Sequence, residues 1–320
     1  MVVHPSTAQA TVHTAEVHDI YRRMLRSAGA RGRFVRRPSG RRVHVVELGR
    51  GEVVVHLHGT NTSALSHLML AERMGSTRSY LVDRPGCGLS DPPNLGQRWR
   101  FRTDAVRFVD EVLDALEVEV TTLVGASGGG IWATWYALER PERVRSLVML
   151  GSVPALPGVR VPLPLRAMVT PVVGDVLARG LKPGPRMLRR MMSSMGEGDT
   201  IGQHPELFES LVAGARDPVA IDANRAELRA LMSPRGFRAA MRIPPEELRR
   251  LTVPTLMIWG DHDPVVPLTH ARAAAASIAD VRLEVLPAGH APQLGNPRKV
   301  ADLLEQFTRE PTGAETEGRQ

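Results

Sequence analysis

The chain has 320 residues, of which 42% are apolar and 23% are charged. This composition is typical of a soluble globular protein with a sizeable core and argues against intrinsic disorder. The formal net charge is +7. However, the basic residues are scattered, and no basic stripe with interleaved aromatic residues occurs, so we expect no nucleic-acid partner.

The sequence also bears on the location of the protein. No stretch approaches 18 uninterrupted apolar residues, so we expect no membrane span. The N-terminus lacks the apolar core of a secretory signal. Cys87 is the only cysteine, which excludes an internal disulfide. Together these features predict a cytoplasmic protein.

The first half of the chain alternates between strand and helix patterns. Residues 1–30 form an N-terminal extension with an amphipathic helix pattern over 14–28. The first part of a core follows over 31–153, where apolar runs typical of buried strands alternate with helical periodicity. The expected strands are a hairpin over 31–49 that turns at Pro38-Ser39-Gly40, then 52–59, 79–83, 121–125 and 145–151. The expected helices are 63–74, 103–117 and 129–139. This alternation predicts an α/β fold with a mainly parallel sheet and helices on both faces.

Residues 154–250 interrupt this alternation. The segment begins with several prolines, continues into a Met-rich stretch, and shows no buried strand pattern. We interpret it as an inserted helical cap, or lid, with helices around 205–215, 222–232 and 245–251. The second part of the core follows over 251–310, with strands 255–260 and 282–287 and helices 269–278 and 297–310. The polar tail 311–320 is expected to be disordered.

The stretch GASGGG at 125–130 lies between an expected strand and an expected helix, and three interpretations compete for it. It can be a plain glycine-rich turn. It also fits a loose dinucleotide-binding pattern, but several strands precede it and the next strand ends in Gly151-Ser152 instead of an acid. The third interpretation makes Ser127 a nucleophile, held in a sharp strand-to-helix turn by small neighbours. The choice depends on whether the chain supplies partners for Ser127.

A nucleophilic serine needs a histidine base and a carboxylate that orients it, in the chain order serine, acid, histidine. His290 follows an expected strand and is the best candidate for the base. The preceding strand ends in a loop that carries Asp261 and Asp263. We favour Asp263 as the acid, because Asp261 is closer to the strand and suits the turn.

An oxyanion hole needs two backbone N–H donors. The sequence offers the N–H of Gly128, at the start of the helix after Ser127, and that of Thr60, in the loop after the strand 52–59. His58, two residues earlier, is expected to be structural. Cys87 has no base nearby in the sequence, so we interpret it as a small residue of a tight loop and not as a nucleophile.

At this point the residues resemble a known family. The segments HGT at 58–60, DRPGCGLSDP at 83–92, GASGG at 125–129 and GDHDPVVP with AGHAPQLGNP after 259 occur in the order typical of the α/β-hydrolase fold superfamily. The resemblance implies an eight-stranded, mostly parallel sheet, with the insertion as its cap. It also implies a catalytic triad of Ser127, Asp263 and His290, and it makes Asp83 and Arg84 structural members of their loop.

The expected chemistry is covalent acyl transfer without a cofactor or a metal. The resemblance implies a serine hydrolase that cleaves an ester or lactone of a small-to-medium apolar substrate. Arginines at 186, 189 and 190 leave open a C–C bond hydrolase of diketo acids, and members of the superfamily also include cofactor-free haloperoxidases. A non-catalytic ligand binder and a homodimeric state are left open as well.

Overall fold

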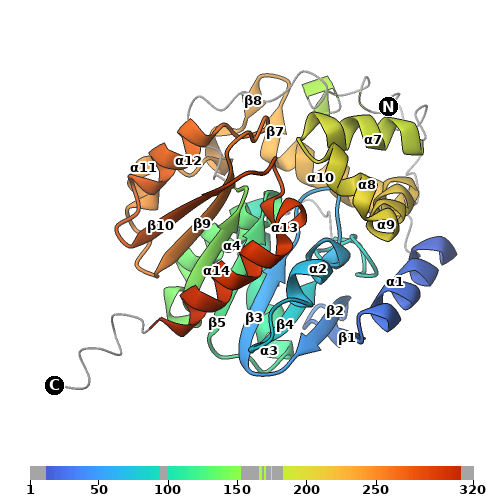
Figure 1. Cartoon of the computed structure of the whole chain (residues 1–320), viewed down its shortest axis with the longest axis horizontal. Coiled ribbons are helices and arrows are strands. Elements are labelled where there is room, and N and C mark those ends of the chain that lie inside the picture. The colour runs from blue at the N-terminus through green and yellow to red at the C-terminus, as the bar shows by residue number, and fades with distance from the viewer. Residues whose placement is uncertain are drawn as a thin grey trace, which may run out of the picture.

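The computed structural model of the protein describes residues 12–93, 100–152 and 183–310, together with residues 166, 167, 169, 170 and 174. An eight-stranded sheet forms its centre (Figure 1). The strands are β1 Arg31–Arg36, β2 Arg42–Gly49, β3 Glu52–Leu57, β4 Thr77–Val82, β5 Thr121–Ala126, β6 Val144–Leu150, β9 Thr255–Gly260 and β10 Val281–Leu286. Their order across the sheet is β1-β2-β4-β3-β5-β6-β9-β10.

The sheet is mostly parallel, as the sequence predicts. Only β2 runs against its neighbours, pairing antiparallel with β1 and β4, while β4, β3, β5, β6, β9 and β10 pair in parallel. The central strands are buried on both sides, and every residue of β5 is buried. This explains why these strands appear in the sequence as continuous apolar runs and not as alternating ones.

Helices cover both faces of the sheet (Figure 1). One apolar cluster contains Val55 and Leu123 of the sheet with Phe108 and Trp135 of the helices, and a second contains their neighbours along the strands, such as Val54. Successive side chains of a strand point to opposite faces, so adjacent residues belong to different clusters. The first face packs against α3 Phe101–Ala115, α4 Gly128–Glu139 and α12 Leu268–Ala275; the second packs against α2 Leu68–Ala71 and α14 Pro297–Arg309.

Two smaller elements differ from the expectation. The predicted helix over 63–74 is a 3-10 turn, η1 Ala64–His67, followed by the single-turn α2. In the loop after β10 the short helix α13 Pro292–Gly295 was not predicted.

The N-terminal helix is confirmed as α1 Ala15–Ser27, and its buried side chains include Ile20 and Tyr21. A further short 3-10 turn, η2 Pro141–Arg143, precedes β6.

Between β6 and β9 the described residues are mostly helical (Figure 1, upper right). The helices are α7 Pro185–Ser194, α8 Gly198–Gln203, α9 Pro205–Arg216, α10 Pro218–Leu231 and α11 Pro245–Leu248, with the 3-10 turn η3 Ala239–Met241. Helix α10 starts earlier than predicted, because Asp217 caps it by accepting from the Ala220 N–H at 3.0 Å and Pro218 occupies its first turn. We call residues 183–250 the described cap; the limits 154–250 stay a prediction, and 154–165 and the tail 311–320 lie outside the described residues.

The described cap also contains an element that the sequence analysis did not predict. It is the small hairpin of β7 Met232–Ser233 and β8 Gly236–Phe237, whose residues are mostly half-buried. Each strand has two residues, which is too short for the alternation of side chains to be visible in a sequence. Gly236 has a φ of +122°, which favours glycine in this turn.

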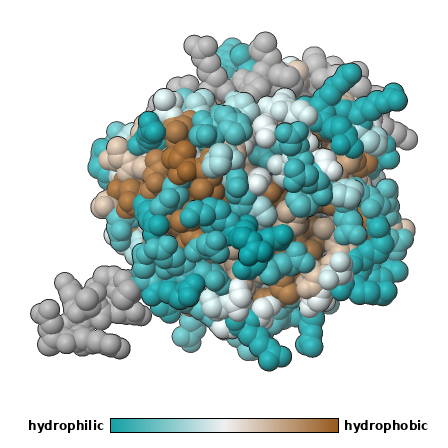
Figure 2. Space-filling model, in the orientation of Figure 1, coloured by the Kyte–Doolittle hydropathy of each residue, from teal (hydrophilic) through white to brown (hydrophobic). Residues whose placement is uncertain are grey.

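The visible surface is largely hydrophilic, with an apolar area at the upper left of Figure 2, on the side of α12 and β10. Strand β10 forms the edge of the sheet, and its Val285 is exposed. None of the helices in the described part combines the length and apolarity needed to span a bilayer.

Candidate active site

Ser127 occupies a strained turn between β5 and α4. Its φ is +47° and its ψ is −119°, a conformation that side chains other than glycine rarely adopt. The surroundings have no room for larger neighbours: a Cβ on Gly125 would lie 2.5 Å from the Cα of Gly130, and one on Gly129 would overlap the carbonyl of Leu57. The close approach of these backbones explains the glycines on both sides of Ser127.

The structure brings the three predicted triad residues together, although they lie in three distant parts of the chain. The Ser127 Oγ is 3.0 Å from the His290 Nε2, and the His290 Nδ1 is 2.9 Å from the Asp263 Oδ2. An ionised carboxylate only accepts, so Nδ1 carries the proton and Nε2 faces the serine hydroxyl as an acceptor. His290 and Asp263 are both buried. This arrangement is suited to drawing a proton from the serine.

Asp263, and not Asp261, is the acid beside His290. The Oδ1 of Asp263 accepts from the backbone N–H groups of Val265 and Val266 at 2.8 and 2.9 Å, which leaves Oδ2 directed at the imidazole. The side chain of Asp261 is half exposed and pairs with His262. The sequence-based preference between the two aspartates therefore agrees with the geometry.

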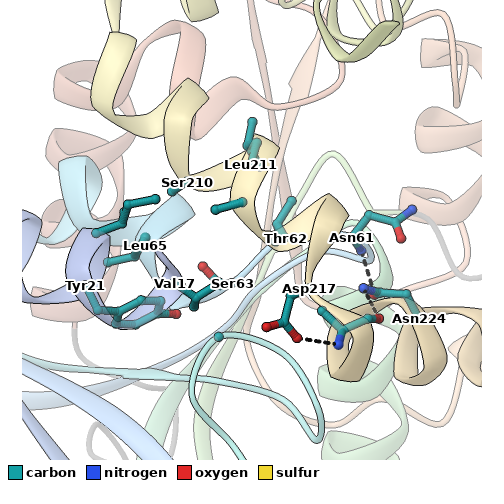
Figure 3. Close-up of a pocket in the computed structure, with 15 residues that line it drawn as sticks. Val17, Tyr21, Asn61, Thr62, Ser63, Leu65, Ser210, Leu211, Asp217 and Asn224 are labelled. Carbon is teal, nitrogen blue, oxygen red and sulfur yellow. Dashed lines mark hydrogen bonds between the residues drawn. The ribbon is translucent and has the colours of Figure 1, made fainter. Parts of the chain in front are cut away.

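The two predicted oxyanion donors lie side by side. A Cβ built on Gly128 would lie 3.3 Å from the backbone nitrogen of Thr60 and would overlap the Thr60 Oγ1. The loop that carries Thr60 is tied to the cap, because the N–H of Asn61 donates to the Oδ1 of Asn224 on α10 at 2.9 Å (Figure 3). Asn61 has a φ of +60°, in the left-handed region that asparagine tolerates better than most residues.

A small cavity of about 30 Å³ adjoins this contact, between α1, the loop after Thr60, and helices α9 and α10 (Figure 3). Tyr21, Asn61, Asp217 and Asn224 are among its lining residues. A cavity of this size holds about two water molecules, so it is not a substrate pocket.

A buried ion pair adjoins Gly128 and was not predicted. The Arg84 Nη1 donates to the Glu227 Oε1 at 2.6 Å, and both side chains are buried. The guanidinium also lies over the ring of Trp132, 5.0 Å from its centroid. The same carboxylate oxygen is 3.4 Å from the position of a Cβ on Gly128. Arg84 thus joins the core to the cap, which agrees with its expected structural role.

His58 and Cys87 are structural, as expected. His58 donates from Nδ1 to the Gly59 carbonyl at 2.8 Å and accepts the Arg84 N–H at Nε2, 3.0 Å away. Burial, together with the charge of Arg84, lowers the pKa of His58 to about 3, so this ring stays neutral. Burial raises the pKa of the Cys87 thiol to about 12, so no reactive thiolate forms there near neutral pH.

The cap contributes apolar packing and exposed charge. Leu188 and Met192 of α7 pack against Phe208 and Leu211 of α9 and against Leu294 of α13. The arginines at 186, 189 and 190 lie on the exposed side of α7, and Arg189 stacks on the ring of Phe208, 4.6 Å from its centroid. Their positions fit an exposed helix face. Within the described ranges, no three histidine, cysteine or acidic side chains are grouped as a metal site requires.

A sequence profile described as the alpha/beta hydrolase family matches residues 54–303. The chain belongs to this family. Among curated proteins this hydrolase is similar to the 2-hydroxymuconate semialdehyde hydrolase of Pseudomonas putida, with 30% identity over 85% of this chain and 92% of that protein. It is also similar to the 2-hydroxy-6-oxononadienedioate/2-hydroxy-6-oxononatrienedioate hydrolase of Cupriavidus pinatubonensis, with 29% identity over 76% of this chain and 82% of that protein.

Solved structures show the same fold. The carboxylesterase CesB from Bacillus subtilis superimposes on this hydrolase with a TM-score of 0.71, over 92% of this chain and 97% of that one, at 23% sequence identity. The fold class and the membership of the α/β-hydrolase superfamily, both predicted from the sequence, are confirmed. The chain is therefore an enzyme of the α/β-hydrolase fold.

Proposed function

We propose that this enzyme is a serine hydrolase that cleaves a carboxylic ester or a lactone of a small-to-medium apolar substrate through an acyl-enzyme at Ser127. The observation that carries the proposal is the continuous contact from Ser127 through His290 to Asp263, with separations of 3.0 and 2.9 Å. A positioned base and an orienting carboxylate are what a serine hydroxyl needs to become a nucleophile near neutral pH.

The proposed reaction has two halves. The His290 Nε2 takes the proton from the Ser127 hydroxyl as its oxygen attacks the substrate carbonyl, and the backbone N–H groups of Thr60 and Gly128 hold the resulting oxyanion. Each such donor is worth about 2.7–4 kcal/mol of transition-state stabilisation. His290 then protonates the leaving alcohol, and water attacks the acyl-enzyme by the same route, which releases the acid and restores the serine. Asp263 stabilises the imidazolium in both halves.

We propose a neutral substrate because of the charged side chains on the cap and next to the site. The arginines of α7 are exposed, and the buried guanidinium of Arg84 is already neutralised by Glu227. The buried cation on this side of the site is therefore already paired with a carboxylate.

Covalent labelling tests the proposed nucleophile. We expect one equivalent of a fluorophosphonate to add to the wild type, as read by intact mass, and none to add to Ser127→Ala. Ser194→Ala is the matched control, because Ser194 is exposed on α7 and its hydroxyl only donates to the Met191 carbonyl; it should label like the wild type. Equal labelling of Ser127→Ala and the wild type would contradict the proposal.

A second candidate function is hydrolysis of a C–C bond in a 2-hydroxy-6-oxo acid. It is favoured by the names of the two relatives at 30% and 29% identity. A panel of p-nitrophenyl esters, aliphatic lactones and a 2-hydroxy-6-oxo-dienoate separates the candidates. We expect kcat/KM to be highest for an ester or lactone; a higher value for the oxo acid would favour the second function.

A further inference from the structure

A segment of the cap lies directly against the loop that carries His290. The backbone N–H of His290 donates to the carbonyl of Met195 at 2.9 Å. Gly196 has a φ of +79°, and a Cβ on it would lie 2.8 Å from the Cα of Gly289. The two backbones are closely packed here, so a shift of this cap segment toward the histidine loop would have to displace the loop as well.

Glu197, the next residue of the cap, completes this contact. Its side chain is fully buried, and its Oε1 accepts from the backbone N–H of Ala291 at 2.7 Å. The cap therefore accepts hydrogen bonds from two consecutive backbone N–H groups of the histidine loop. The N–H of His290 donates to the Met195 carbonyl, and the N–H of Ala291 donates to the Glu197 carboxylate.

A buried carboxylate is costly, so its position calls for a reason. Burial raises the pKa of Glu197, while the Ala291 N–H and the nearby His290 act in the opposite direction. The Oε2 of Glu197 is buried and makes no hydrogen bond of ordinary geometry, although the Thr200 hydroxyl is close enough to lower the pKa of this carboxyl. An apolar side chain would fill the same space at lower cost but could not accept the Ala291 N–H.

We propose that Glu197 is a positioning residue for the catalytic base, because it couples the cap to the His290 loop by accepting the Ala291 N–H. The imidazole then keeps its 3.0 Å contact with Ser127 only while this part of the cap is packed against the loop. The proposal rests on the proposed function, in which His290 is the base. It assigns to the cap a part in assembling the catalytic geometry, in addition to covering the site.

The test compares three variants with the wild type. Glu197→Ala removes the acceptor, whereas Glu197→Gln keeps an amide oxygen for the Ala291 N–H. Glu206→Ala is the matched control, because Glu206 is an exposed glutamate in the first turn of α9. The readouts are the rate of fluorophosphonate labelling, kcat and KM for the best ester, and the thermal midpoint.

We expect Glu197→Ala to label at least about tenfold more slowly and to lose kcat with little change in KM. Glu197→Gln should recover a labelling rate within about threefold of the wild type, and Glu206→Ala should match the wild type. A purely structural role would lower the thermal midpoint of Glu197→Ala and leave its labelling rate unchanged. That result, or equal losses in the Ala and Gln variants, would overturn the proposal.

The experiment also separates a folding failure of the variant from a failure of the proposed function. If Glu197→Ala does not fold, Gly196→Ala takes its place, because its Cβ pushes the cap segment away from Gly289; a wild-type labelling rate in that variant would also overturn the coupling. If the wild type itself shows no labelling that depends on Ser127, the proposed function fails, and the inference about Glu197 fails with it.

Discussion

At the scale of single residues, the site depends on which of two nearby carboxylates reaches the imidazole. Asp261 and Asp263 are two positions apart, and only Asp263 is buried against His290. Two backbone N–H groups, from Val265 and Val266, hold its other oxygen. A carboxylate that is held in this way orients a histidine better than a longer or freer acid would, because its position does not change as the imidazole gains its proton.

Replacement of Asp263 by asparagine tests this role. The amide is nearly the same size, but it can present an N–H to His290 and so favours the wrong tautomer of the ring. We expect kcat for an ester to fall by about 10⁴-fold, with KM within a few-fold of the wild type and an unchanged circular dichroism spectrum. Asp261→Asn is the control and should keep kcat within about threefold. Similar losses in the two variants would refute the assignment of Asp263.

At the scale of elements, helix α1 joins the cap to the core. His13, just before α1, places Nδ1 3.0 Å from the Oδ1 of Asp217, at the start of α10, and Nε2 2.8 Å from the carbonyl of Ser90, in the loop after β4. Both partners only accept, while a neutral imidazole has a single N–H. Both hydrogen bonds can therefore form at the same time only when His13 is in its imidazolium form.

This contact should depend on pH. Burial alone would lower the pKa of His13, but its hydrogen bonds to Asp217 and Ser90 outweigh burial and raise the pKa above the ordinary value of 6.5. A raised pKa in the folded state means that the contribution to stability is complete below about pH 6.5 and is lost as the pH rises through the pKa of the folded protein. The N-terminal segment should therefore loosen in mildly alkaline solution.

Denaturation of the wild type and of His13→Gln at a series of pH values measures this effect. We expect the wild type to be more stable at pH 6, and the difference in the free energy of unfolding to shrink toward pH 9. Val12→Ala is a control, because Val12 precedes His13 and is exposed; its difference from the wild type should not vary with pH. A difference for His13→Gln that is constant from pH 6 to pH 9 would contradict the imidazolium assignment.

At the scale of the whole molecule, one buried carboxylate connects four parts of the fold. Asp83 follows β4 and is fully buried. It accepts from the Tyr21 hydroxyl of α1 at 2.6 Å, from the Nδ1 of His44 on β2 at 2.9 Å, and from the backbone N–H groups of Ala64 and Leu89 at 2.8 and 3.2 Å. Burial by itself would raise the pKa of Asp83, but these contacts, the one with His44 foremost, lower it.

Removal of this carboxylate should destabilise the whole protein. Asp83→Ala leaves several buried donors without a partner, and we expect a loss of about 3–5 kcal/mol in the free energy of unfolding, measured by urea denaturation. Tyr21→Phe removes a single hydrogen bond of the same network and should cost about 1 kcal/mol. If the two variants lose the same amount, Asp83 does not act as the common acceptor that the structure indicates.

Much of the architecture could be predicted because its signals are local. Continuous apolar runs mark the strands of a parallel sheet, helical periodicity marks α1, α3 and α14, and the glycines beside Ser127 mark a tight turn. The candidate triad could be proposed as well, because elbow, acid and histidine follow one another in a set order at the ends of strands. The short hairpin β7–β8 could not, since two-residue strands carry no period.

The contacts that join the cap to the core could not be read from the sequence. Nothing around Glu197, Asn224 or Glu227 marks these residues, because each is defined by a partner more than 90 positions away along the chain: Ala291, Asn61 and Arg84. The sequence by itself determined the fold class and the candidate nucleophile, base and acid. Only the tertiary structure decided which residues bind the cap to the core beside this candidate site. Hydrogen bonds between distant segments form only after the sheet has brought their loops to one edge.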